Sequence, residues 1–269
     1  MKAAPFSYVR PTSPKGVLTE MSLAPGEAKI IAGGQSLMPV LAMRLGRPPT
    51  LVDISRVSAW QSIEVGAHEV RIGAAVRQRA VERHGDLRIP LLSRALPWIG
   101  HREIRSRGTV CGSLAHADPA SELPAVMVTL GARLGITGPG GDRELPADEF
   151  FRGAMTTALE PGEVLRHVTV PRARRGQGFG FAEMARRHGD FALVGVTTMV
   201  QTEGDQVVRA LLGAFGVADR PRLLDVTETV AGPLRSATDA GGADAVAEAL
   251  ADAARELVTT GGDKHASDG

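Results

Sequence analysis

The stretch Thr109–Glu122, TVCGSLAHADPASE, decides the fold and function that this sequence predicts, together with an earlier stretch, Ala32–Ser36, AGGQS. Both consist mainly of small residues after an apolar run, so each is predicted to be a loop that exposes backbone N–H groups. Glycine lets a backbone approach a ligand closely, and successive N–H groups in a turn form a concavity that favours an anion. Two such loops in one domain predict a site that holds a pyrophosphate from both sides.

The composition of the 269-residue chain is that of an ordinary globular protein, with 43% hydrophobic and 23% charged residues. A net charge of +1 and an aromatic content of 4% give no indication of nucleic-acid binding. The single cysteine, Cys111, excludes an internal disulfide and a cysteine-ligated cluster held by this chain alone. The N-terminus lacks an apolar signal core and no run reaches transmembrane length, so we expect a cytoplasmic protein without an integral membrane segment.

The hydrophobic pattern predicts an α+β chain in two parts. A basic, glycine-rich stretch at 172–178 indicates the boundary, which gives predicted domains at 1–172 and 176–269. In the second part, strands around a turn at Gly204-Asp205 precede two helices, the order typical of a separate α+β domain. The predicted strands are 28–32, 51–54, 69–72, 132–137, 164–170, 192–201 and 206–215, and the predicted helices are 17–23, 37–45, 78–84, 91–99, 122–130, 223–230 and 243–257. A turn is predicted at 138–141 and a short helix or loop at 145–151.

The pair Asp118-Pro119 is predicted to begin the helix that continues through 122–130. An aspartate accepts a backbone N–H at a helix start, and proline is favoured at the first helical position. Asp118 is therefore interpreted as a cap and not as a ligand of the site.

Five segments, in this order, resemble a known family: AGGQSLMPVLAMRL (32–45), LVDIS (51–55), IRSRGTVCGSLAHADPASELP (104–124), GEVLRHVTVP (162–171) and ARRHGDFALVG (185–195). They resemble the medium, FAD-binding subunits of the molybdenum hydroxylases. That family includes the carbon monoxide dehydrogenase flavoprotein, the flavin domain of xanthine dehydrogenase, and nicotine and caffeine dehydrogenases. The resemblance covers nearly the whole chain.

The resemblance implies an FAD-binding domain of the vanillyl-alcohol-oxidase (PCMH) type, followed by a smaller C-terminal α+β domain. It also implies a heterotrimer with a small iron–sulfur subunit and a large molybdenum-cofactor subunit, and a dimer of such heterotrimers. Electrons would pass from the large subunit through the iron–sulfur clusters to FAD in this chain, and then to an external acceptor. Because the task of this chain would be electron transfer, neither a catalytic acid or base nor a metal site is expected in it.

The resemblance also implies which residues contact FAD. Those expected around the pyrophosphate are Ala32, Gly33, Gly34, Gln35, Ser36 and Leu37, facing Thr109, Cys111, Gly112 and Ser113. Those expected elsewhere along the cofactor are Ile99, His116, Glu122, Leu165 and Glu183.

Several of these residues have a second interpretation. Cys111 stands where relatives have glycine, and is either a thiol near the flavin or a small buried hydrophobe. Glu122 is either a ligand of FAD hydroxyl groups or a first-turn acid favoured by the helix dipole. His116 either faces the flavin edge or is solvated. Ile99 and Leu165 could be ordinary core residues whether or not they also contact FAD.

Two departures from the family pattern have expected consequences. Glu183 stands where many relatives carry a lysine near the flavin, so the flavin potential is expected to be tuned differently, with Arg186, Arg187 or His188 as candidate replacements. The polar segment DKHASDG (263–269) resembles the point where relatives continue into a final helix, and we expect that helix to be absent or altered.

Two other functions stay open from the sequence alone. One is a stand-alone FAD-dependent oxidoreductase with a small-molecule substrate of its own, which would need a catalytic acid or base that the motifs do not supply. The other is a scaffold that has lost its flavin, against which both glycine stretches argue.

Overall fold

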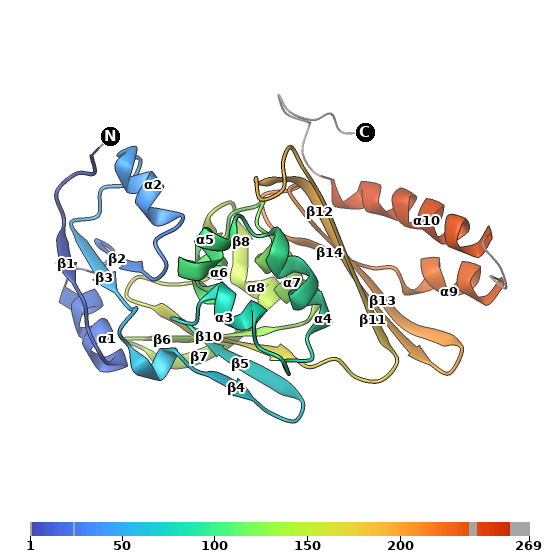
Figure 1. The fold of residues 1–269 in the computed structure, drawn as a ribbon, viewed down its shortest axis with the longest axis horizontal. Coiled ribbons are helices and arrows are strands. Elements are labelled where there is room, and N and C mark those ends of the chain that lie inside the picture. Colours follow the sequence, from blue (N-terminus) through green and yellow to red (C-terminus); the bar gives the residue numbers. More distant parts are fainter. Residues whose placement is uncertain (1, 24, 237–240, 259–269) are drawn as a thin grey trace.

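The computed structural model describes residues 2–23, 25–236 and 241–258. Its three main sheets follow one another along the long axis of the molecule in chain order (Figure 1). The predicted final-helix region at 263–269 lies outside the described residues. Among the helices that the structure describes, none combines the length and apolar character needed to cross a membrane.

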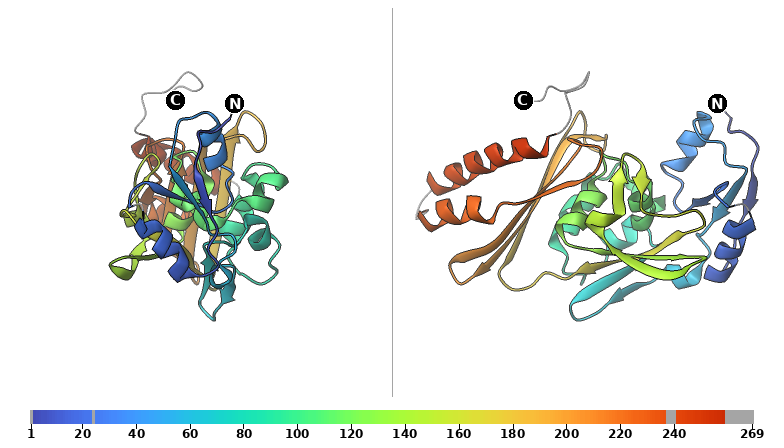
Figure 2. Two further views of the ribbon diagram at one scale, coloured as in Figure 1. Left: turned by 90° about the vertical axis from the view of Figure 1, so that its left-hand side faces the viewer. Right: turned by 180° about the vertical axis from the view of Figure 1, so that it is seen from behind.

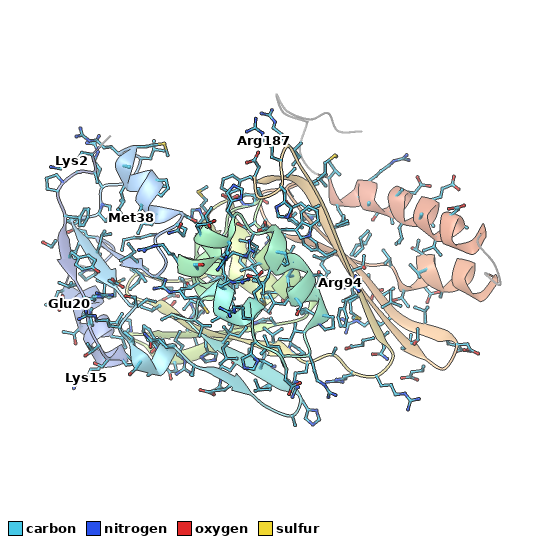
Figure 3. All side chains as sticks on the ribbon, viewed as in Figure 1. Lys2, Lys15, Glu20, Met38, Arg94 and Arg187 are labelled. Atoms are coloured by element: carbon cyan, nitrogen blue, oxygen red, sulfur yellow. The ribbon has the colours of Figure 1, made fainter. Side chains whose placement is uncertain are left out.

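The first sheet contains three parallel strands in the order β1-β3-β2. They are β1 (Ser7–Val9), β2 (Ala28–Ile31) and β3 (Thr50–Asp53), accompanied by the helices α1 (Pro14–Leu23) and α2 (Leu37–Ala42). Because the strands are parallel, their carboxyl ends lie at one edge of the sheet, which is where ligands commonly bind in open parallel sheets. The AGGQS stretch directly follows β2 at this edge. Met38 on α2, labelled in Figure 3, is exposed beside it.

The second sheet has five antiparallel strands in the order β4-β5-β10-β6-β7. Their bounds are β4 (Ile63–Val65), β5 (Glu69–Gly73), β6 (Arg133–Gly138), β7 (Gly141–Pro146) and β10 (Val164–Pro171). Side chains alternate between the faces, so Val168 and Val170 of the central strand point into the main core while His167 and Thr169 point away.

Short helices cover the apolar face of this sheet (Figure 1). They are α3 (Gln78–Glu82), α4 (Pro90–Ala95), α5 (Arg102–Arg107), α6 (Val110–His116) and α7 (Glu122–Thr129), with 3₁₀ turns at Ser58–Trp60 and Leu96–Trp98. A small element follows β7, formed by α8 (Ala147–Phe150), β8 (Phe151–Gly153) and β9 (Thr156–Thr157). All eight residues of α7 are buried, which makes this helix the centre of the core.

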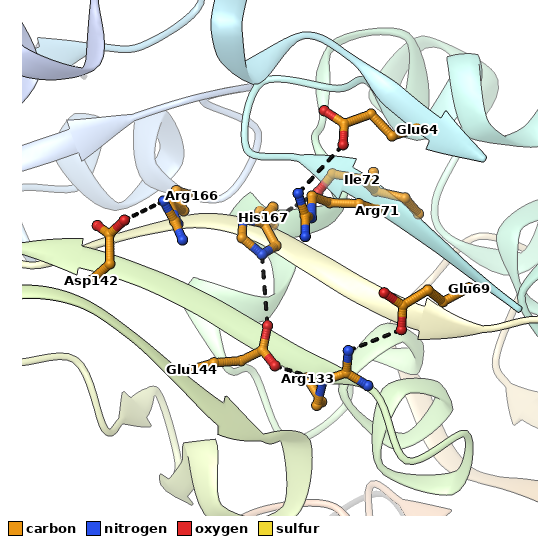
Figure 4. Close-up of polar contacts among 10 residues, drawn as sticks. Glu64, Glu69, Arg71, Ile72, Arg133, Asp142, Glu144, Arg166 and His167 are labelled. Atoms are coloured by element: carbon orange, nitrogen blue, oxygen red, sulfur yellow. Dashed lines mark hydrogen bonds and ion pairs between the residues drawn. The ribbon is translucent and has the colours of Figure 1, made fainter. Parts of the chain in front are cut away.

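The other face of the five-stranded sheet carries a polar network (Figure 4). Its arginines are already paired with carboxylates, as expected for a solvated surface: Arg71 with Glu64, Arg133 with Glu69 and Glu144, and Arg166 with Asp142. The pKa of His167 is lowered, first by burial and then by Arg166 and Arg71. None of the residues predicted to bind FAD belongs to this network.

The third sheet is an antiparallel meander of β11 (Gln177–Ala185), β12 (Ala192–Glu203), β13 (Gln206–Phe215) and β14 (Arg222–Asp225). The helices α9 (Thr227–Ser236) and α10 (Gly241–Ala254), with a final turn at Arg255–Leu257, lie on its outer side (Figure 2). Its inner side packs on α7, where the hydroxyl groups of Thr129 and Thr197 are 2.7 Å apart. The sheet therefore touches the core of the preceding part of the chain.

The structure corrects two predictions around the second glycine stretch. The expected loop contains a helix, α6, for which Thr109 is the N-cap residue. The next helix begins only at Glu122, with Ser121 before it, so Asp118-Pro119 does not begin a helix. Asp118 instead accepts the N–H of Ala120 at 2.9 Å, because an aspartate can close a turn with its own side chain.

Other predictions differ in the kind of element. The predicted helix at 223–230 is wrong at its start, because Arg222–Asp225 pairs with β13 as a strand and the helix begins at Thr227. The segment predicted at 145–151 begins as the end of β7 before the short helix α8. The strands β1 and β4 and the helix α5 were not predicted, since each is short and depends on pairing or packing with distant residues.

Candidate functional site

The two glycine stretches lie against each other. A Cβ atom placed on Gly33 would be 2.4 Å from the carbonyl oxygen of Arg107, and one placed on Gly112 would be 3.6 Å from the Cβ atom of Ala32. The segments that begin at Ala32 and Thr109, far apart in sequence, therefore meet at the carboxyl edge of the first sheet, as the pyrophosphate hypothesis requires.

The first stretch leaves its backbone N–H groups unused. Within the described part of the chain, the N–H groups of Gly33, Gly34, Gln35 and Ser36 donate no hydrogen bond to another residue. The turn depends on Gly34, whose φ of +73° is a conformation that residues with a side chain rarely adopt. The side chain of Gln35 folds back onto the turn and donates to the carbonyl oxygen of Gly33 at 3.2 Å. Successive free N–H groups of this kind suit an anion.

The second stretch uses most of its N–H groups within the protein. The N–H of Gly112 donates to the hydroxyl of Thr109 at 3.0 Å, and the N–H of Ser113 donates to the Thr109 carbonyl at 3.2 Å. The N–H of Val110 reaches the carbonyl oxygen of Val76 at 3.4 Å. In this first helical turn, only the N–H of Cys111 has no acceptor among the described residues.

Gly33 and Gly112 are both constrained by the protein itself. A side chain at Gly33 would collide with the backbone of Arg107 and Gly108, and one at Gly112 would lie 2.6 Å from the Thr109 hydroxyl oxygen. The sequence interpretation ascribed both glycines to close approach of a ligand. The structure shows that Gly33 is already needed for contact between two protein segments, and Gly112 for the close approach of the Thr109 hydroxyl within its own segment. Each is a separate reason for glycine at these positions.

The sequence matches a family described as the FAD binding domain in molybdopterin dehydrogenase over residues 4–173. This chain belongs to that family. The caffeine dehydrogenase subunit beta of Pseudomonas sp. (strain CBB1) is 37% identical, over 82% of this chain and 76% of that protein. The carbon monoxide dehydrogenase medium chain of Afipia carboxidovorans is 33% identical, over 80% of this chain and 76% of that protein.

The fold also has a close structural relative. The structure matches that of quinoline 2-oxidoreductase from Pseudomonas putida 86 with a TM-score of 0.90 and 35% identity, covering 100% of this chain and 92% of that one. The sequence-based assignment to the FAD-binding medium subunits of molybdenum hydroxylases is confirmed, as are the α+β fold class and the oxidoreductase class.

The residues at the two stretches fit the FAD diphosphate. Four free N–H groups can donate to its oxygens, with the remaining N–H of Cys111 on the other side. Leu37, the first residue of α2, extends the same turn. Donation from backbone N–H groups is the usual way in which proteins hold phosphate groups without a dedicated side chain.

Two buried carboxyl groups, one on α7 and one on the third sheet, are close enough to influence each other's charge. Glu122, in the first turn of α7, has a pKa raised to about 7 by burial and, to a smaller extent, by the charges of Glu183 and Asp118. Burial also raises the pKa of Glu183, on β11, to about 7. Both carboxyl oxygens of Glu183 are buried without a hydrogen-bond partner among the described residues. Such oxygens need donors, and the hydroxyl groups of FAD are donors of that kind.

The other predicted residues lie in different surroundings. The Cys111 thiol is buried and donates to the Ile72 carbonyl oxygen at 3.6 Å, and burial raises its pKa to about 12. It therefore behaves as a small buried residue and not as a reactive thiol. His116 is half-buried at the end of α6, with Nε2 3.9 Å from Asp118. Leu165 is 3% exposed and belongs to the main core.

Arg105 supports the segment that carries Ile99, and the sequence interpretation missed it. Its guanidinium donates to both carboxylate oxygens of Glu82, at 3.0 and 3.2 Å. It also donates to the carbonyl oxygens of Ile99 and Gly100, at 3.1 and 2.9 Å. A planar guanidinium suits this fixed set of acceptors. The motif IRSRG (104–108) contains two arginines, and only the folded structure shows that Arg105 lies on the buried side of α5.

A second missed cluster lies at the carboxyl edge of the first sheet. Asp53 accepts hydrogen bonds from the hydroxyl of Tyr8 and the N–H of Ser55, and Arg10 lies 3.2 Å from it. Burial acts to raise the pKa of Asp53, but these hydrogen bonds and Arg10 hold it below its usual value. The cluster joins the ends of β1 and β3 beside the free N–H groups.

Proposed function

We propose that this chain is the electron outlet of a heterotrimeric molybdenum hydroxylase. It would receive electrons from the iron–sulfur clusters of a small partner subunit, with substrate hydroxylation on a large molybdenum-cofactor subunit, and deliver them to an external acceptor. Bound FAD supplies the capacity to accept and release electrons. The residues of this chain bind and orient that cofactor.

The free N–H groups of Gly33–Ser36, in a member of this family, are the observation that carries the proposal. These groups are hydrogen-bond donors that suit a diphosphate, and within the described residues they donate to no protein acceptor. The single cysteine of the chain cannot supply the set of thiolates that an iron–sulfur cluster needs. Electrons from such a cluster would therefore have to come from another chain.

The contacts with FAD follow from the position of each residue. Residues 32–37 would hold the diphosphate from one side and the start of α6, from Thr109 to Ser113, from the other. Glu122 and Glu183 would accept hydrogen bonds from cofactor hydroxyl groups. Ile99, His116 and Leu165 would line the remainder, with Leu165 limited to apolar contact because it is buried.

The wider assembly is part of the same proposal. Residues 1–172 would form the FAD-binding domain and 176–269 a second domain, since the second sheet ends at Pro171 and the third begins at Gln177. Two heterotrimers would form a dimer, in the cytoplasm. The names of the relatives, as beta and medium chains of dehydrogenases, support a multisubunit enzyme.

Reconstitution tests the proposal against a stand-alone oxidoreductase. The purified chain is loaded with FAD and assayed with substrate and an artificial electron acceptor, first alone and then with the iron–sulfur and molybdenum subunits. We expect FAD binding by the lone chain, and turnover only in the mixture. Turnover by the lone chain at the rate of the mixture would contradict the electron-outlet function.

A further inference from the structure

Arg77 contacts one of the two segments that face the proposed diphosphate position, and also the backbone carbonyl against which the other segment packs. Its backbone forms an isolated antiparallel bridge with Thr109, the N-cap residue of α6. The bridge is flanked by hydrogen bonds from Gln78 N–H to Gly108 at 2.9 Å and from Val110 N–H to Val76 at 3.4 Å. The start of α6 is therefore fixed to the segment that carries Arg77.

The side chain of Arg77 extends this link to the first glycine turn. Its guanidinium donates a hydrogen bond to the carbonyl oxygen of Arg107. That same carbonyl is the group against which Gly33 packs, at 2.4 Å from the position of a Cβ atom. The Arg77 side chain thus fixes the backbone at Arg107, which lies between the Gly33–Ser36 turn and α6.

The charges around Arg77 favour an anion at this place. Its pKa is lowered by burial first, and then by the positive charges of Arg107 and Arg10, against the opposing effect of Asp53. Asp53 is already engaged by Tyr8 and Arg10. Three guanidinium groups therefore act on a region with one carboxylate, beside N–H groups that have no acceptor.

We propose that Arg77 is a positioning residue for FAD, which holds the first glycine turn and the start of α6 in the spacing that a diphosphate requires. The inference rests on the proposed placement of the diphosphate between these two segments. Arg77 acts through the Arg107 carbonyl, so the property that matters is its hydrogen-bond donor. Lysine keeps a charged donor at the end of a flexible chain, whereas methionine keeps only the apolar bulk.

The test compares Arg77→Met and Arg77→Lys with a matched control in the full-length chain. Arg79→Met removes an arginine two residues away, on α3, whose side chain pairs with Glu82 at 2.9 Å and, within the described residues, makes no hydrogen bond to either segment. FAD is titrated into each apoprotein by flavin fluorescence, and urea unfolding of each apoprotein is measured separately. We expect Arg77→Met to raise the FAD dissociation constant about tenfold, the usual effect of losing a charged hydrogen bond. Arg77→Lys should recover most of this, and Arg79→Met should stay within about twofold of the unaltered chain.

The outcomes separate positioning from a general effect on folding. Weak FAD binding by Arg77→Met, rescue by lysine, and an unfolding midpoint equal to that of the control would support the proposal. Unchanged FAD affinity in Arg77→Met would overturn it. Equal losses of FAD affinity in both Arg77 variants, in proportion to a lower unfolding midpoint, would also overturn it, because the residue would then act on stability alone. If the unaltered chain failed to bind FAD, the proposed function and not the role of Arg77 would be at fault.

Discussion

The two glycine stretches of the site have similar compositions, yet they form different structures. AGGQS forms a turn whose four N–H groups, from Gly33 to Ser36, donate to no described residue. TVCGS forms the start of a helix, in which Thr109 accepts the N–H groups of Gly112 and Ser113. Glycine content alone therefore does not distinguish an open anion-binding turn from a capped helix start. The distinguishing feature is the capping residue Thr109, because its side chain and carbonyl oxygen accept the N–H groups that would otherwise be free to bind an anion.

The largest expected effect is at the open turn. Gly34→Val should weaken FAD binding by about 100-fold, since a β-branched residue strongly resists a positive φ and would turn the free N–H groups away from the diphosphate. The space around Gly34 is bounded by flexible ends of Ile31 and Met38, at 3.3 Å, so the fold itself should persist. FAD titration measures the loss of affinity, and circular dichroism checks that the fold is retained. An unaltered dissociation constant would place the diphosphate elsewhere.

A pH-dependent effect is expected at Glu183, beyond the second stretch. Its pKa is about 7 in the folded chain, above the ordinary 4.5, so the folded state holds the proton more tightly. Stability of the apoprotein should therefore fall as the pH rises from about 4.5 to 7, because the buried carboxylate becomes charged without a partner. Glu183→Gln should reduce this fall, leaving the part that Glu122 contributes through its own pKa of about 7. The variant should be more stable at pH 8 by roughly 1–3 kcal/mol, the usual cost of an unsatisfied buried group.

Urea unfolding of the apoprotein at both ends of this pH range measures the effect. Glu203→Gln, at an exposed position on the same sheet, is the control. If the two variants showed the same pH dependence, Glu183 would not be the titrating group.

A smaller effect is expected at the capped helix start. Thr109→Val keeps the shape of the residue but removes the hydroxyl that accepts from Gly112. The free energy of unfolding should fall by about 1 kcal/mol, as for loss of other helix caps. FAD affinity should change far less than in Gly34→Val, since the main diphosphate donors lie in the other segment. A larger loss of FAD affinity here than at Gly34 would reverse the comparison between the two stretches.

The smallest effect on FAD binding is expected at Cys111, also in the second stretch. Its side chain points to the Ile72 carbonyl in the core, so Cys111→Ala should leave FAD affinity unchanged and lower the free energy of unfolding by about 1 kcal/mol. Because the thiol is buried and its pKa is about 12, it should not react with a thiol reagent in the native protein. Rapid modification at neutral pH, with loss of bound FAD, would show that it faces the cofactor.

The sequence by itself determined the family, the α+β class and the proximity of the two glycine stretches. These follow from local patterns: small residues after apolar runs, alternation in strands such as Val164–Pro171, and five motifs in a fixed order. The apolar residues also located most helices, although Glu122–Thr129 has no alternation of apolar and polar faces because all eight of its residues are buried.

Only the tertiary structure decided which N–H groups are free and why each glycine is needed. Gly33 is constrained by the Arg107 carbonyl, which also accepts a hydrogen bond from the Arg77 side chain. Arg105 pairs with Glu82, and Asp53 accepts from Tyr8, because folding brings distant segments of the chain side by side. A hydrogen bond between residues 30 positions apart leaves no local pattern in the sequence, because its geometry exists only once the chain has folded.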